Sequence, residues 1–135
     1  DGDGWSPLAT ATTGGFLATA QLLLENFADV DQPSFSGRTA LMRASRRGAL
    51  KTCEWLLAHG ASLDKKDING DSALLLAAQE GHVQVVDLLL SKGMSIEETD
   101  PSGWTPLVWA TKQGHQALAR HLLEQGASLQ GDHQG

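Results

Sequence analysis

Four arginines lie close together in the first half of the chain, and their chemistry is that of anion recognition. Arg38, Arg43, Arg46 and Arg47 fall within ten residues. The guanidinium group is planar, keeps its charge at physiological pH, and donates paired hydrogen bonds that match a carboxylate. These arginines therefore indicate a basic surface that binds an acidic or carboxylate-bearing segment of a partner.

The charge of the chain is unevenly distributed around these arginines. The 135 residues carry a formal charge of −6, but residues 34–66 hold seven cations against Glu54 and Asp64, which gives +5. The remainder of the chain is therefore at −11. An acidic remainder repels nucleic acid, so a protein or peptide with acidic groups is the expected partner. The alternative is a solvated face whose arginines pair with Asp71 and Glu80.

Two tryptophans and a lysine form a second group of residues with binding chemistry. Trp104, Trp109 and Lys112 lie within nine residues near the end of the chain. Tryptophan and arginine are the residue types most often found at the energetic centres of protein interfaces. We therefore expect this segment to contact a partner, although packing inside the molecule is an alternative for both tryptophans.

The remaining reactive side chains show no catalytic or metal-binding pattern. The five histidines lack the spacing of metal ligands, and a single cysteine excludes both a disulfide framework and a cysteine-based zinc site. Cys53 is expected to be a small buried residue inside a helix. No phosphate-binding glycine loop or nucleophile elbow occurs, and no apolar run approaches the roughly 18 residues of a membrane span. We expect no enzymatic activity, no cofactor, no metal and no membrane insertion.

A repeat of 33 residues positions these groups. Glycine recurs with this spacing at Gly4, Gly37, Gly70 and Gly103, and leucine at Leu8, Leu41, Leu74 and Leu107. The predicted repeats are 1–33, 34–66, 67–99 and 100–132, followed by a tail at 133–135. A unit this short cannot bury its apolar face alone, so neighbouring repeats must stack into one continuous core.

Each repeat predicts two short helices. The first helices are expected at 7–13, 40–46, 73–79 and 106–112, and the second helices at 17–25, 50–58, 83–91 and 116–124. A serine or threonine precedes each first helix, where its hydroxyl can cap free amides: Ser6, Thr39, Ser72 and Thr105. His82 and His115, which precede second helices, are expected to hydrogen-bond the neighbouring turn.

Glycines predict where these helices end, since glycine readily adopts the left-handed backbone of a helix terminus. The second helices of the last three repeats end before Gly60, Gly93 and Gly126. Phe27 occupies the equivalent position of the first repeat, where a left-handed backbone would be strained. We therefore expect Asn26 to adopt that conformation instead.

These motifs resemble the signature of the ankyrin-repeat family over essentially the whole chain. The matching segments are Gly-Trp-Ser-Pro-Leu at 4–8, Gly-Arg-Thr-Ala-Leu at 37–41, Gly-Asp-Ser-Ala-Leu at 70–74, Gly-Trp-Thr-Pro-Leu at 103–107, and Gly-Ala-Ser-Leu at 60–63 and 126–129. The resemblance implies an all-α solenoid of four 33-residue helix–turn–helix units with β-hairpin fingers. It also implies a non-catalytic module that binds proteins along a concave groove made by the fingers and first helices.

The resemblance places the candidate arginines and tryptophans at or beside this groove. The predicted partner-binding residues are Arg38, Arg43, Arg46, Arg47, Asp71, Trp104, Trp109 and Lys112. The resulting prediction is a monomeric, intracellular interaction module that takes a partner peptide or surface.

Two other functions remain as alternatives. The segment 103–111 resembles the part of the ankyrin domains of histone lysine methyltransferases in which two tryptophans help to form a methyl-lysine cage, which implies a histone-tail reader using Trp104 and Trp109. Lys112 opposes this function, because a cation one turn after Trp109 repels a cationic ligand. The other alternative is a structural spacer within a longer array.

Overall fold

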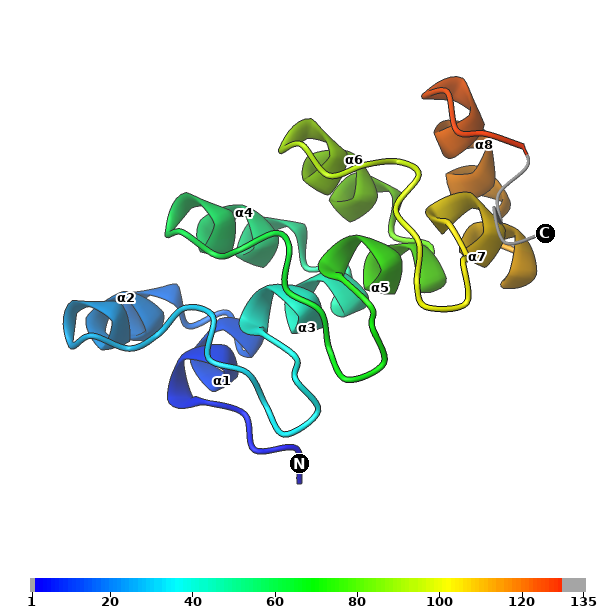
Figure 1. The fold of residues 1–135 in the computed structure, drawn as a ribbon. Coiled ribbons are helices and arrows are strands. Elements are labelled where there is room, and N and C mark those ends of the chain that lie inside the picture. The colour runs from blue at the N-terminus through cyan, green and yellow to red at the C-terminus, as the bar shows by residue number, and fades with distance from the viewer. Residues whose placement is uncertain (1, 130–135) are drawn as a thin grey trace.

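The protein is a stack of helix pairs. The structure is a computed structural model that describes residues 2–129, and the predicted tail at 133–135 lies outside these residues. The described residues form eight helices: α1 (Pro7–Thr13), α2 (Leu17–Glu25), α3 (Ala40–Arg47), α4 (Leu50–Ala58), α5 (Ala73–Gln79), α6 (Val83–Ser91), α7 (Pro106–Lys112) and α8 (Gln116–Glu124). Figure 1 shows the odd-numbered helices in one row and the even-numbered helices in a second row beside it.

The first helix of each pair begins at the predicted hydroxyl cap. The side-chain oxygen of Ser6 accepts a hydrogen bond from the Ala9 amide at 3.1 Å. Thr39, Ser72 and Thr105 make the equivalent bond at 3.2–3.3 Å. Such a cap contributes about 1 kcal/mol to helix stability. All eight helices follow the predicted ranges, except that α3 continues for one further residue to Arg47.

The end of α2 differs from the sequence expectation. Phe27 has a φ of 68°, whereas Asn26 has a φ of −102°, so the prediction that Asn26 takes the left-handed conformation is wrong. The helix closes with two hydrogen bonds, from the Phe27 amide to the Leu24 carbonyl and from the Ala28 amide to the Leu23 carbonyl, both at 3.0 Å. This pair of bonds requires a left-handed residue at position 27, whatever its side chain.

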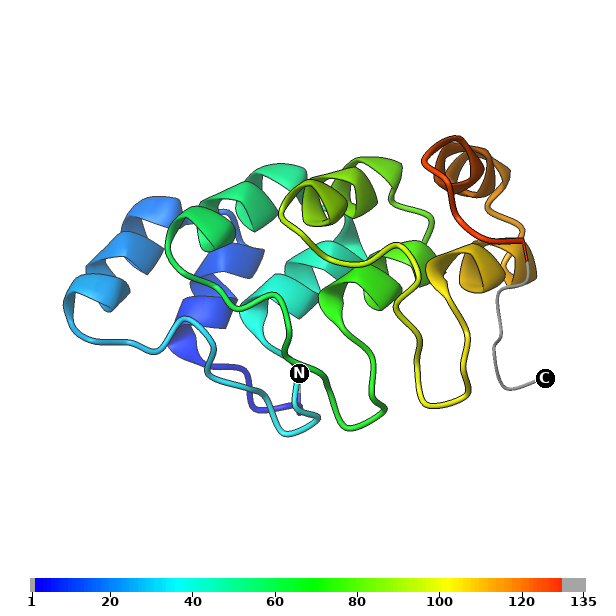
Figure 2. The same ribbon diagram turned by 45° about the horizontal axis from the view of Figure 1, so that its top comes forward.

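Three long loops, which we call fingers, connect the helix pairs at residues 26–39, 59–72 and 92–105 and project from one edge of the array (Figure 2). The expected β-hairpins are not found, since residues 2–129 contain no β-strand. The first finger is closed by hydrogen bonds from the Ser34 amide to the Arg38 carbonyl (2.8 Å) and from the Gly37 amide to the Ser34 carbonyl (2.9 Å). Two bonds close a tight turn but do not build a strand ladder.

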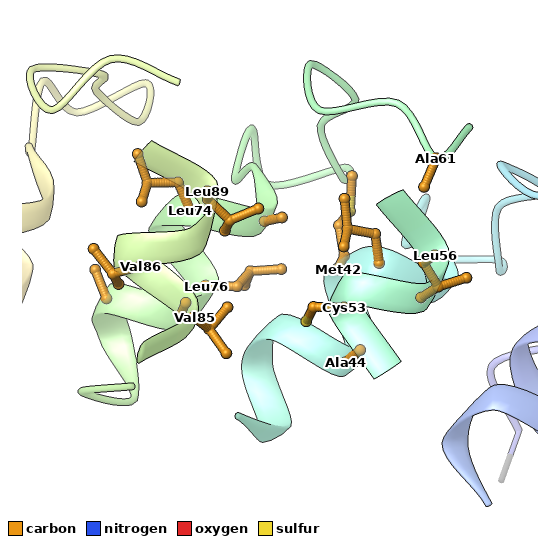
Figure 3. Packing of buried hydrophobic residues seen from close by; sticks show 14 of the residues in the cluster. Met42, Ala44, Cys53, Leu56, Ala61, Leu74, Leu76, Val85, Val86 and Leu89 are labelled. Atoms are coloured by element: carbon orange, nitrogen blue, oxygen red, sulfur yellow. The ribbon is translucent and has the colours of Figure 1, made fainter. Parts of the chain in front are cut away.

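The core lies between the two rows of helices and continues from pair to pair. The repeated leucines Leu8, Leu41, Leu74 and Leu107 are all buried. Figure 3 shows part of this core, with Met42, Ala44 and Cys53 near one another. Cys53 is fully buried, as predicted, and its burial raises the pKa of its thiol to about 11.

Candidate partner-binding site

The structure gathers all four predicted arginines around one pocket. This pocket, which we call the arginine pocket, has a volume of about 590 Å³ and is lined by Asp3, Trp5, Ser36, Arg38, Arg43, Arg46, Arg47 and Glu80. Three of the arginines belong to α3, at positions i, i+3 and i+4, which share one face of a helix. The remaining walls come from the segment before α1, the first finger and the residue that follows α5.

Arg38 connects two neighbouring fingers. Its Nε donates to Oδ2 of Asp67 at 3.1 Å, and the Asp67 side chain is fully buried. The other oxygen of Asp67 accepts from the amides of Asn69 (2.9 Å) and Asp71 (3.0 Å), which closes the second finger. A buried carboxylate with this many donors is strongly held. Arg38 therefore positions the second finger as well as lining the pocket.

Arg43 lies over an aromatic wall that the sequence-based site prediction left out. Its guanidinium carbon is 4.4 Å from the ring centroid of Trp5, a cation–π arrangement. Burial and the neighbouring charge of Arg47 lower the pKa of Arg43, and the charge of Asp3 opposes this shift. The sequence does contain a signal for Trp5, because Trp5 lies 33 residues before Arg38 and so occupies the equivalent position of the preceding repeat.

Arg46 and Arg47 form the exposed side of the pocket, on the last turn of α3. Arg46 Nε is 3.8 Å from Oε2 of Glu80, and both side chains are about half exposed. A long, exposed ion pair of this kind contributes little to stability. Arg47 makes no ion pair or side-chain hydrogen bond with any residue between 2 and 129. These two side chains are therefore accessible to an anion from outside.

His82 holds the end of the helix that carries these arginines. Its Nε2 lies 2.9 Å from the Arg46 carbonyl, and because a carbonyl can only accept, Nε2 must carry the proton. The ring covers Gly48, where a Cβ would lie 2.5 Å from Nδ1. His115 makes the equivalent bond to the Gln79 carbonyl at 2.8 Å. Both contacts confirm the predicted hydrogen bonds to the neighbouring turn.

Asp71 lies away from the arginine pocket. Its side chain was expected on the exposed groove surface, but the residue is only 9% exposed. Its amide and carbonyl both hydrogen-bond Asp67, which draws it into the closed base of the second finger. Burial and the charges of Asp67 and Asp100 raise the pKa of Asp71, and Gln79 opposes this shift. Arg38 therefore forms its ion pair with Asp67, and not with Asp71 as the solvated-face alternative expected.

The tryptophan group forms a separate cluster on the last helix pair. The rings of Trp104 and Trp109 pack edge to face, with centroids 4.8 Å apart. The indole nitrogen of Trp109 donates to Asp100 at 3.0 Å. Lys112 places its ammonium 5.1 Å from the Trp104 ring centroid. Trp104 therefore contacts both Trp109 and Lys112, and none of the three lines the arginine pocket.

Metal sites and membrane-spanning helices both have geometric requirements. Between residues 2 and 129, no group of three histidine, cysteine or carboxylate side chains is placed to hold a metal ion. Within the same range, no helix is both long and apolar enough to cross a membrane.

Stacked helix pairs with fingers on one edge define a helical repeat protein. The family described as ankyrin repeats (3 copies) matches residues 1–67 and 62–131, and the chain belongs to this family. A search of curated proteins found no match. Ankyrin repeats generally mediate protein–protein interactions and are typically not catalytic.

Proposed function

We propose that this chain is a non-catalytic interaction module that binds an acidic segment of a partner protein in the arginine pocket, along the concave groove of the array. The observation that carries the proposal is the convergence of four arginines on one open pocket, with Arg46 and Arg47 accessible. This arrangement rests on the inferred repeats 1–33, 34–66, 67–99 and 100–132, since the pocket spans residues from the first three.

The charges of the pocket favour an acidic protein segment over other partners. Arginine forks bind carboxylates through paired, charge-assisted hydrogen bonds. Glu80 is held too loosely by Arg46 to compete strongly with such a ligand. The rest of the chain is strongly acidic, which disfavours the long anionic surfaces of nucleic acids.

The tryptophan cluster is proposed as a secondary peptide contact. Trp104 and Trp109 are partly exposed, which supports contact with a partner more than a purely structural spacer role. The Lys112 ammonium already lies over the Trp104 ring, where a methylated lysine would have to displace it. This geometry favours peptide contact over the methyl-lysine alternative.

An affinity purification with quantitative mass spectrometry tests the proposal. The double variant Arg46→Glu/Arg47→Glu should lose partners that the unchanged chain retains, because it reverses the charge of the accessible wall. The matched control is Lys65→Glu/Lys66→Glu, which makes the same charge change at two exposed residues of the same inferred repeat, outside the pocket. An identical set of partners for the arginine variant and the unchanged chain would show that the pocket is not the binding site.

A further inference from the structure

We infer that the arginine pocket recognises a phosphorylated serine or threonine side chain in the partner segment, in preference to aspartate or glutamate. This inference rests on the proposed function, since it specifies the ligand of the same site.

The two accessible arginines, Arg46 and Arg47, together carry two positive charges, which one carboxylate does not neutralise. Asp67 neutralises Arg38, and the charge of Asp3 acts on Arg43. The pocket arginines most open to a ligand are therefore Arg46 and Arg47, beside the loosely held Glu80. A carboxylate carries one negative charge, whereas a phosphorylated side chain carries about −1.5 to −2 at pH 7. A phosphate group therefore matches the two charges of Arg46 and Arg47 better than a carboxylate does.

Asp3 does not act as a replaceable ligand of these arginines. Its Oδ2 accepts from the Ser36 hydroxyl at 2.7 Å, and its Oδ1 accepts from the Ser36 amide at 3.0 Å. Hydrogen bonds from Ser34 and Ser36 lower the pKa of Asp3, so it remains a charged and fixed part of the wall. An incoming anion must therefore approach from the side of Arg46 and Arg47.

The accessible arginines have hydrogen-bond donors available. Arg38 is engaged by Asp67, and Arg43 lies over Trp5. The Arg46–Glu80 separation of 3.8 Å is longer than a hydrogen bond, and Arg47 has no ion-pair partner between residues 2 and 129. The guanidinium groups of Arg46 and Arg47, at the mouth of the pocket, can thus each donate paired hydrogen bonds to two of the three acceptor oxygens of a phosphate.

The arginines are held together against their mutual repulsion. The charge of Arg47 acts on Arg43, whose guanidinium is partly buried. His82 fixes the end of α3, so that the face carrying Arg43, Arg46 and Arg47 is held in place. A bound dianion would relieve this repulsion without requiring the helix to move. A site that is already formed before binding costs less free energy to order, which favours tight binding.

Exposed apolar residues next to the pocket favour a peptide over a free anion. Phe35 and Ile68, at the tips of two fingers, are 81% and 75% exposed. Their amides bond the carbonyls of Asp3 and Ser36, which are both pocket residues, at 2.7 and 3.0 Å. A phosphorylated residue in the pocket would therefore place neighbouring apolar side chains of a peptide on these tips.

Fluorescence anisotropy with three labelled peptide pools tests this inference on the purified chain. The pools are randomised around a central phosphoserine, glutamate or serine. The phosphoserine pool should bind about tenfold more tightly than the glutamate pool, a difference typical of an added charge-assisted bond. Arg46→Glu/Arg47→Glu should abolish this preference, and Lys65→Glu/Lys66→Glu should retain it. Arg46→Lys/Arg47→Lys, which keeps the charge but removes the forks, should reduce it.

The outcomes separate the inference from the proposed function. Equal binding of the glutamate and phosphoserine pools, with loss in the arginine variant, overturns the phosphate preference and leaves the acidic-peptide function standing. If no peptide pool binds, or if Arg46→Glu/Arg47→Glu leaves peptide binding unchanged, both the phosphate preference and the acidic-peptide function are overturned. Tighter binding to vesicles containing phosphoinositide than to the phosphoserine pool identifies a membrane ligand and overturns the peptide inference. Thermal unfolding of each variant by circular dichroism establishes that it is folded.

Discussion

Phe27 shows how one residue can adopt a conformation that its own chemistry disfavours. A left-handed backbone costs a residue with a Cβ roughly 1–2 kcal/mol, because the Cβ approaches the following carbonyl. The two hydrogen bonds that close α2 nevertheless impose this backbone. The Phe27 side chain is 95% exposed, so its packing offers little compensation.

Replacing Phe27 with glycine should stabilise the protein. We expect Phe27→Gly to raise the free energy of unfolding by about 0.5–1 kcal/mol, since relief of backbone strain exceeds the additional entropy that glycine loses on folding. Urea unfolding measured by circular dichroism checks this value. The control is Phe27→Ala, which removes the aromatic ring but keeps the Cβ. An equal gain from alanine would attribute the effect to the ring and contradict the backbone explanation.

At the scale of the helix, the end of α3 links stability to binding. The His82 bond to the Arg46 carbonyl and the His115 bond to the Gln79 carbonyl are structurally equivalent contacts of successive helix pairs. Only the first of them holds the helix that carries three pocket arginines. His115 therefore serves as a matched control when the role of His82 in positioning α3 is tested.

His82→Ala and His115→Ala should have similar effects on stability and different effects on binding. Each loses one inter-repeat hydrogen bond and should lower the free energy of unfolding by about 1 kcal/mol. His82→Ala should in addition weaken binding of the phosphoserine peptide pool, because the end of α3 is no longer held in place. Urea unfolding and fluorescence anisotropy give the two readouts. Equal binding by both variants would show that His82 has only a structural role.

At the scale of the whole molecule, the fold is a line of helix pairs that each contact only their neighbours. Helix α5 packs between α3 and α7, and its first six residues, 73–78, are all buried. In α2, at one end of the described array, Ala20 is the only buried residue. Stability in such an array depends on neighbouring interfaces, so it should be highest in the interior.

Hydrogen exchange should follow this order. Backbone amides of α5 should exchange most slowly, and those of α2 and α8 most rapidly, because local opening is easiest where fewest apolar contacts are lost. Exchange followed by mass spectrometry on the purified chain measures this gradient. Uniform protection in all eight helices would indicate a single cooperative unit and contradict a stack governed by nearest neighbours.

The helices and their caps followed from the sequence, because they depend on residues close together in the chain. A hydroxyl three residues before the amide that it caps, and a glycine at a turn, act locally. The 33-residue period then predicted which elements stack. The clustering of four arginines around one surface was also predictable, because three of them lie on one face of a short helix.

The finer features depended on contacts between repeats, which one segment of sequence does not specify. Arg38 pairs with Asp67, 29 residues away, and this contact accompanies the burial of Asp71. Arg43 lies over Trp5 from the preceding repeat. The fingers are turns without strands because few amides pair between them. The sequence by itself determined the repeat and its helices, whereas packing between repeats decided which arginines are structurally engaged and which remain accessible to a partner.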